Sequence, residues 1–285
     1  MLNKFFFTIF IVAVAIGAMP IHPAKAASTT VVALGTIEPG YLIRGQVFSA
    51  VYYYGSDGFR YVFPNDKTYF TWYTDFDDVK WVSDADLGKL QIGGNVTYKP
   101  GVKMIKINTD PKVYAVDRGG SLIAVGSEAI AEELFGASWN THIDDVPDGF
   151  FSNYEVSDDE LTVSADVTAY ENSLITYDCF DINDDRGLTA FTQINMTDNA
   201  YSDIEVTIEP GDVVRFVNNG SNKHTATADD LDWGSGTVSA GGGFWQRRFS
   251  EAGTYTYFCS YHPSMTGTII VQYIFSGSGG SPCPP

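Results

Sequence analysis

Short runs in which apolar and polar residues alternate recur over the last third of the chain, and such runs predict half-buried β-strands. The clearest is Ile204-Glu205-Val206-Thr207-Ile208, where every second side chain can face a core. Similar runs predict strands over residues 192–196, 213–217, 244–249, 254–258 and 266–272. Turn sequences such as Glu209-Pro210-Gly211-Asp212 separate them. Short strands with regular turn signals predict a β-sandwich over residues 190–273.

Residues 27–155 carry a different pattern, with an internal repeat. Leu42-Ile43-Arg44 recurs as Met104-Ile105-Lys106, and Tyr61-Val62 recurs as Ile123-Ala124, at an offset of about sixty residues. Each copy contains a strand, a Gly-rich turn, a second strand and a helical or irregular stretch, which is typical of a hairpin-containing unit. We expect one α+β domain whose two copies pack face to face, because a single hairpin buries too little apolar surface.

Three further features of the repeat domain follow from its residue types. Ser127 is a typical N-cap for a helix over residues 128–135, and Gly136 is a typical residue to end it. One set of aromatic residues favours core and cross-strand packing, with a glycan-binding platform as the alternative: Tyr52, Tyr53, Tyr54, Tyr69, Phe70, Trp72 and Tyr73. His142 has no thiol or second imidazole near it in the sequence. The repeat domain therefore offers no catalytic or metal-binding constellation.

An acidic segment, residues 156–189, connects the two regions. Acidic runs at 157–160 and 181–185 flank a more apolar stretch, and alternation over 161–165 predicts a strand. The segment is either a linker or an extra strand of the sandwich, and the sequence leaves both open. Together, these patterns predict a mainly β chain that has an N-terminal α+β domain of two hairpin-containing repeats.

Charge and length narrow the classes of partner. The 285 residues, 44% of them hydrophobic, are enough for two ordinary domains. The formal net charge of -18 excludes a nucleic-acid partner, since nothing here could neutralise a phosphate backbone. It also argues against binding to an anionic lipid surface.

The N-terminus has the pattern of a secretory signal. Lys4 precedes an uncharged apolar run over residues 5–19, and Ala24-Lys25-Ala26 fits a cleavage site. We expect residues 1–26 to be a signal peptide and the protein to be extracytoplasmic, whether secreted, periplasmic or at the cell surface. An uncleaved N-terminal anchor is the alternative. No later stretch is long enough to span a bilayer.

The three cysteines differ in context. Cys259 lies at the end of a predicted strand, whereas Cys283 lies in the Gly/Ser/Pro tail over residues 274–285, which is expected to be flexible. In an oxidising compartment Cys179 and Cys283 could pair. Cys283 could instead stay free or attach the protein to another molecule.

Four side chains carry the candidate chemistry: His224, Cys259, His262 and Met265. A thiolate and two imidazoles in one plane, with a weak thioether on the axis, are the ligands of a blue copper site. Such a site has no open coordination position and therefore favours electron transfer over catalysis. Zinc also accepts imidazole and thiolate, but a thioether suits it less well. Packing of these side chains in a core without metal is the remaining alternative.

The flanking sequence resembles the plastocyanin-like cupredoxins. The run from Glu209 to Asn219 before His224 resembles their first-ligand region, and Gly253-Thr254-Tyr255-Thr256-Tyr257-Phe258-Cys259 resembles their ligand loop. The two-residue gaps between ligands match the amicyanin type. The resemblance implies a Greek-key sandwich over residues 190–273 that binds one type 1 copper.

The same resemblance implies roles for three further residues. The Thr225 N–H would bond to the Cys259 sulfur, and Tyr261 and Pro263 would form an apolar docking patch. The implied function is a one-electron carrier that serves redox partner proteins and is not an enzyme. Two alternatives stay open: an extracytoplasmic copper-handling protein, and a structural or adhesive envelope protein with a cupredoxin scaffold.

Overall fold

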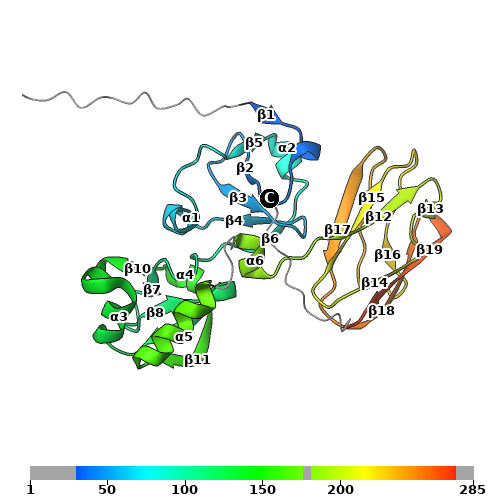
Figure 1. Cartoon of the computed structure of the whole chain (residues 1–285). Helices are drawn as coiled ribbons and strands as arrows, with labels where there is room; N and C mark the ends of the chain where they lie inside the picture. The colour runs from blue at the N-terminus through cyan, green and yellow to red at the C-terminus, as the bar shows by residue number, and fades with distance from the viewer. Residues whose placement is uncertain (1–29, 176–180, 274–285) are drawn as a thin grey trace, which may run out of the picture.

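The computed structural model describes residues 30–175 and 181–273. These residues form three bodies, each built around β-sheet, which lie side by side in Figure 1. We call them the first module (31–96), the second module (104–175) and the sandwich (190–273). The expected signal segment, Cys179 and the tail with Cys283 lie outside the described residues.

The first module is a six-stranded mixed sheet with strand order β1-β5-β2-β3-β4-β6. Strands β2, β3 and β4 form an antiparallel meander, and β5 and β6 pair in parallel with β2 and β4. The elements are β1 (Val31–Val32), η1 (Leu34–Thr36), β2 (Leu42–Arg44), β3 (Val51–Tyr54), β4 (Arg60–Val62), α1 (Asp66–Trp72), β5 (Lys80–Val82), α2 (Asp84–Leu87) and β6 (Ile92–Asn95).

The second module is a five-stranded sheet with strand order β10-β7-β8-β9-β11. Its β7-β8-β9 meander, with β10 and β11 added in parallel, has the same pairing scheme as β5-β2-β3-β4-β6 of the first module. The elements are β7 (Met104–Lys106), β8 (Tyr114–Val116), η2 (Arg118–Gly120), β9 (Ser121–Val125), α3 (Glu128–Phe135), η3 (Gly136–His142), β10 (Ile143–Asp145), α4 (Asp148–Phe151), β11 (Glu155–Leu161) and α5 (Ser164–Ile175).

Helix α3 begins and ends as its capping residues predict. The Ser127 hydroxyl accepts a hydrogen bond from the Ile130 N–H, and Gly136 takes a positive φ of 72° at the other end. A positive φ costs a residue with a Cβ more than it costs glycine. The prediction of this helix from Ser127 and Gly136 is confirmed.

The modules do not pack face to face as expected, because each sheet has its own apolar clusters. Alternation places Leu42 and Ile43, neighbours on β2, in two different clusters of the first module. The second module has two clusters of its own. The boundary also differs from position 155, because β11 pairs with β9 and extends the second module. The acidic segment thus supplies a strand to this sheet and not to the sandwich. The strand predicted over residues 161–165 is wrong, because β11 ends at Leu161 and helix α5 begins at Ser164.

The sandwich consists of two four-stranded sheets, β13-β12-β15-β17 and β14-β19-β18-β16. Its inward side chains form one cluster that includes Ile194, Phe216, Tyr257 and Ile269, each at most 1% exposed. The predicted mainly-β fold and the C-terminal sandwich are confirmed. The strands are β12 (Thr192–Thr197), β13 (Ala200–Tyr201), β14 (Glu205–Ile208), β15 (Val213–Asn218), β16 (Thr227–Ala228), β17 (Gly243–Arg248), β18 (Gly253–Cys259) and β19 (His262–Val271).

The first module covers the outer face of one sheet of the sandwich. Alternation along β15 places Val214 and Phe216 in the core and turns Arg215 to the opposite face. There the Arg215 guanidinium donates a 3.0 Å hydrogen bond to the Gly58 carbonyl, in the turn between β3 and β4. Arg215 is only 8% exposed as a result.

A partly buried ion pair, between Asp57 and Arg248, lies next to this contact. The Asp57 carboxylate, 1% exposed, accepts hydrogen bonds from the Arg248 guanidinium and, at 2.5 Å, from the Tyr61 hydroxyl. Arg248 also donates to the Gly211 carbonyl at 2.6 Å. Removing Arg248 would leave the buried Asp57 carboxylate without its counter-charge. These contacts therefore hold the first module to the sandwich in a defined position.

Helix α6 (Ile182–Arg186) joins the first and second modules, between which it lies in Figure 1. Ile182 is fully buried in a cluster of the first module. Asp185 accepts a 3.0 Å hydrogen bond from the Gly119 N–H of the second module. Burial raises the pKa of Asp185 to about 6, although the Gly119 N–H opposes this shift.

The raised pKa of Asp185 predicts a pH-dependent stability. Because the folded pKa exceeds the unfolded value, the contribution is fully present below about pH 4 and is lost as the pH rises through about 6. We expect the Asp185→Asn variant to be more stable than the parent at pH 7.5 by about 1–3 kcal/mol. Denaturant unfolding between pH 4 and 8 measures this, with the exposed Asp158→Asn as the control. A parallel pH profile in parent and Asp185→Asn would contradict the prediction.

Candidate metal centre

His224 is fixed by the loop that follows β15. Its backbone exchanges two hydrogen bonds with Val238, of 3.2 and 2.8 Å. The buried amide of Asn218 donates to the carbonyls of Asn222 and Val238, both at 2.8 Å. The side chain of His224 is fully buried. The role of Asn218 could not be predicted from the sequence, because a single amide at the end of a strand does not indicate which carbonyls it will bond.

Cys259 and His262 face each other across a tight turn. Cys259 ends β18, His262 begins β19, and the two are paired after a register shift between Phe258 and Cys259. Ser260 and Tyr261 form the turn. The Ser260 N–H donates a 2.8 Å hydrogen bond to the Thr225 hydroxyl, which ties this hairpin to the residue after His224. The two segments that carry candidate ligands are therefore held together by a direct contact, which the sequence analysis missed.

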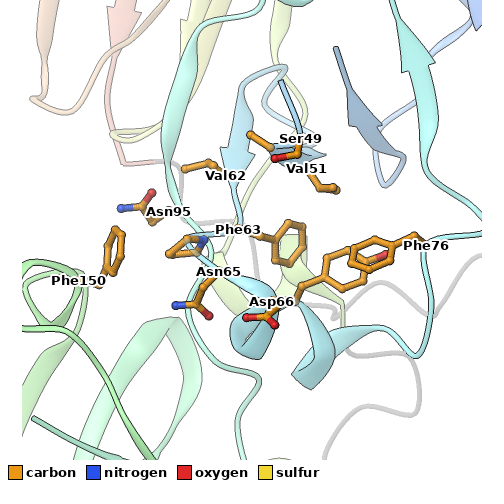
Figure 2. A pocket seen from close by; sticks show the side chains of 12 residues that line it. Ser49, Val51, Val62, Phe63, Asn65, Asp66, Phe76, Asn95 and Phe150 are labelled. Atoms are coloured by element: carbon orange, nitrogen blue, oxygen red, sulfur yellow. The ribbon is translucent and has the colours of Figure 1, made fainter. Parts of the chain in front are cut away.

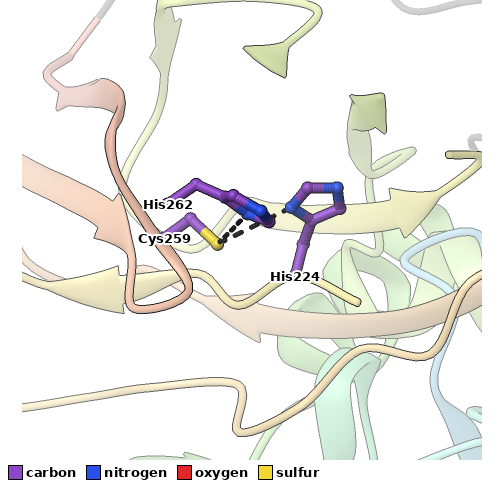
Figure 3. A group of neighbouring side chains, drawn as sticks. All are labelled: His224, Cys259 and His262. Atoms are coloured by element: carbon purple, nitrogen blue, oxygen red, sulfur yellow. Dashed lines mark hydrogen bonds between the residues drawn. The ribbon is translucent and has the colours of Figure 1, made fainter. Parts of the chain in front are cut away.

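The structure brings three of the four candidate ligands together (Figure 3). The Cys259 sulfur lies 3.6 Å from Nδ1 of His224 and 3.7 Å from Nδ1 of His262. One donor atom from each residue lies within 4.8 Å of the others. The Thr225 N–H points at the same sulfur, 3.3 Å away. The hydrogen bond that the cupredoxin resemblance implied for Thr225 is present.

These distances fit a single ion shared by the three side chains. An ion about 2.3 Å from a thiolate sulfur and about 2.0 Å from an imidazole nitrogen separates the two donors by about 3.5–3.7 Å for tetrahedral or trigonal angles. Both observed sulfur–nitrogen distances lie in this interval. The donor set, two imidazoles and a soft thiolate, suits copper.

The surroundings of His224 favour its neutral form. Burial lowers the pKa of its imidazole, and the neighbouring His262 imidazole lowers it further, while Asp198 acts in the opposite direction. The Nε2 atom is buried and has no hydrogen-bond partner within the described part of the chain. A tautomer with its proton on Nε2 leaves the Nδ1 lone pair directed at the thiolate side of the cluster.

Met265 lies in the hydrophobic cluster that also contains Cys259, and only 2% of it is exposed. It follows His262 on β19 by three residues, so the hairpin that carries Cys259 also carries the thioether. Burial in this cluster is compatible both with an axial ligand and with a core methionine. Its assignment as a ligand stays a prediction.

The cluster of His224, Cys259 and His262 approaches the protein surface at His262. His262 is half-buried, Pro263 is exposed, and Tyr261 is 41% exposed. The Lys223 ammonium lies 4.3 Å from the centre of the Tyr261 ring, and the Thr237 and Tyr261 hydroxyls are 2.8 Å apart. The rim around His262 thus combines apolar surface with one cation.

The fold and the cluster together define a metal-binding β-sandwich with a type 1 copper-like site. Residues 189–272 match the family described as copper binding proteins, plastocyanin/azurin family. A curated plastocyanin from Scenedesmus fuscus is 37% identical over 79 residues, which cover 24% of this chain and 81% of that protein. The chain therefore belongs, through its sandwich, to the plastocyanin/azurin family of copper-binding proteins.

Solved structures of two cupredoxins also match. A novel purple cupredoxin from Nitrosopumilus maritimus is 25% identical, with 28% of this chain and 99% of that chain covered and a TM-score of 0.27. Amicyanin from Paracoccus versutus is 29% identical, with 29% of this chain and 81% of that chain covered and a TM-score of 0.27. The residues that match the family, 189–272, include neither the first nor the second module.

A separate cavity of about 500 Å³ lies where the first module meets α4 of the second. Phe150 stands at one end and Phe76 at the other (Figure 2). Two of its polar side chains already have partners: Asn65 caps α1, and Asn95 donates to Asn153 at 2.9 Å. The aromatic residue Tyr69 is 2% exposed and stacks on Phe76. At this position the structure therefore supports core packing rather than a glycan-binding platform.

Proposed function

We propose that this protein is an extracytoplasmic blue copper protein that carries single electrons between redox partners. One copper ion per chain would be held by His224, Cys259 and His262, with the Met265 thioether as a weak fourth donor. The observation that carries the proposal is the convergence of the Cys259 sulfur on the Nδ1 atoms of both histidines, at 3.6 and 3.7 Å. Bound copper would supply a Cu(II)/Cu(I) couple.

The residues around the site support a carrier better than an enzyme. Cys259 and His224 are fully buried, so no substrate reaches the sulfur directly. The Thr225 N–H donates to that sulfur and tunes its basicity. The half-buried His262, between the exposed Tyr261 and Pro263, is the edge through which an electron would leave. The sequence has four histidines and no His-x-His pair, which multicopper oxidase chemistry would need.

The location and the docking surface form part of the same proposal. The N-terminal segment has the pattern of a signal peptide. No helix in the part of the chain that the structure describes is long and apolar enough to cross a membrane. Because the first module covers the outer face of the sheet that contains β15, redox partners would dock at the Tyr261 rim instead.

Copper reconstitution of the full chain tests the proposal. We expect an intense visible band from thiolate-to-copper charge transfer and a reversible one-electron couple by voltammetry. Fast electron self-exchange would support a carrier. Slow exchange with very tight Cu(I) binding would support copper handling instead, and a colourless Cu(II) adduct would reject the type 1 site.

A further inference from the structure

A cavity of about 490 Å³ separates the first module from the outer face of the sandwich. Its size is within the range of small-molecule sites, which are common at domain interfaces. Three aromatic side chains, Tyr54, Phe191 and Phe244, line it together with Arg215. Two cationic side chains, Arg215 and Lys89, lie in its otherwise mostly apolar wall, and Lys89 already pairs with Asp86 at 2.7 Å.

Arg215 is held rigidly in this wall. The centres of the Phe191 and Phe244 rings lie 3.9 and 4.7 Å from its guanidinium carbon. Its Nε atom donates to Gln246 at 2.8 Å, and Nη2 donates to the Gly58 carbonyl at 3.0 Å. The guanidinium is therefore fixed in orientation before any ligand arrives, which reduces the entropy lost on binding.

The charge of Arg215 is not neutralised by a direct partner. Its hydrogen-bond acceptors are an amide, a carbonyl and a hydroxyl, and within residues 30–175 and 181–273 it forms no ion pair. The nearby Asp57 is engaged by Arg248. A buried charge without a counter-charge is costly, so an anion that enters the cavity would gain from pairing with it.

A second donor accompanies the guanidinium. The Tyr54 hydroxyl, on a side chain that is 6% exposed, accepts long contacts of 3.3 and 3.4 Å from Arg215. Within residues 30–175 and 181–273 this hydroxyl donates no hydrogen bond of its own. The Nη1 atom of Arg215 carries two N–H groups and makes a single contact. One of these N–H groups is therefore available to donate to a ligand. Two donors on adjacent groups match the two oxygens of a carboxylate.

We propose that this cavity binds a small organic carboxylate with a flat apolar body. Arg215 and Tyr54 hold the carboxylate, while Phe191 and Phe244 contact the apolar part. A dianionic phosphate group fits less well, since it presents more acceptors than the two donors satisfy and is repelled more strongly by the acidic protein. The site is independent of the copper ligands.

Titration of the metal-free full chain with benzoate tests the proposal, with neutral benzamide as the matched ligand. We expect saturable one-to-one binding of benzoate by calorimetry and at least about tenfold weaker binding of benzamide, because the benzoate bonds are charge-assisted. The Arg215→Gln variant should weaken benzoate binding about tenfold or more. Tyr54→Phe keeps the ring in place and should weaken it about three- to tenfold.

Lys67→Gln is the charge-matched control. Lys67 is an exposed cation outside the cavity lining, so its removal should leave the benzoate affinity within about twofold. Equal affinities for benzoate and benzamide, equal affinities in parent and Tyr54→Phe, or no saturation at millimolar benzoate would each overturn the proposal. Arg215 would then serve only to hold the first module on the sandwich.

Discussion

Replacing Cys259 by serine is expected to abolish the intense visible absorption of the copper-loaded protein. The band arises from charge transfer between a thiolate and copper, and a hydroxyl is a harder, weaker donor. Copper affinity should fall more than about tenfold, while His224 and His262 still bind weakly. Absorption and EPR spectra of the copper-loaded variant, together with a competition titration for Cu(I), measure the two effects.

Ser260→Ala is the matched control for this change. It alters the next residue, whose side chain is exposed, and keeps the backbone N–H that donates to Thr225. The control should retain the full band. The stability of metal-free Cys259→Ser should fall by only about 1–2 kcal/mol, the cost of burying a hydroxyl in place of a thiol. An undiminished band in Cys259→Ser would show that another group holds the metal.

Replacing Gly58 by alanine is expected to separate the first module from the sandwich. A Cβ at this position would overlap the Nη2 atom of Arg215 and approach the Gln246 side chain. The φ angle of +79° adds backbone strain for any residue with a Cβ. We expect a loss of about 2–4 kcal/mol in unfolding free energy. Small-angle scattering should also show a larger radius of gyration.

The Gly187→Ala variant distinguishes the steric overlap with Arg215 from the backbone strain of a positive φ. Gly187 has a left-handed φ of +59°, but no heavy atom would lie within 4 Å of an added Cβ. This control should lose only the backbone cost of about 1–2 kcal/mol and keep the compact scattering profile. Equal losses and unchanged scattering in both variants would mean that the contact between Gly58 and Arg215 does not hold the modules together.

The sequence was most informative where local pattern decides local structure. Period-two alternation marked the strands of the sandwich, since the side chains of an extended strand point alternately to opposite faces. The caps Ser127 and Gly136 marked helix α3, because a helix end needs a side-chain acceptor and a residue tolerant of positive φ. The two-residue gaps between Cys259, His262 and Met265 marked one short loop that carries three candidate ligands.

Contacts between distant segments required the tertiary structure. Alternation showed that Arg215 faces away from the core of the sandwich, but not that the Gly58 turn would cover it, because these residues are separated by most of the chain. The acidic residues of β11 gave no sign that the strand would pair with β9. Likewise, the sequence identified the residue types for a copper site, and only the packing of the hairpin against the His224 loop brought their donor atoms within reach of one ion.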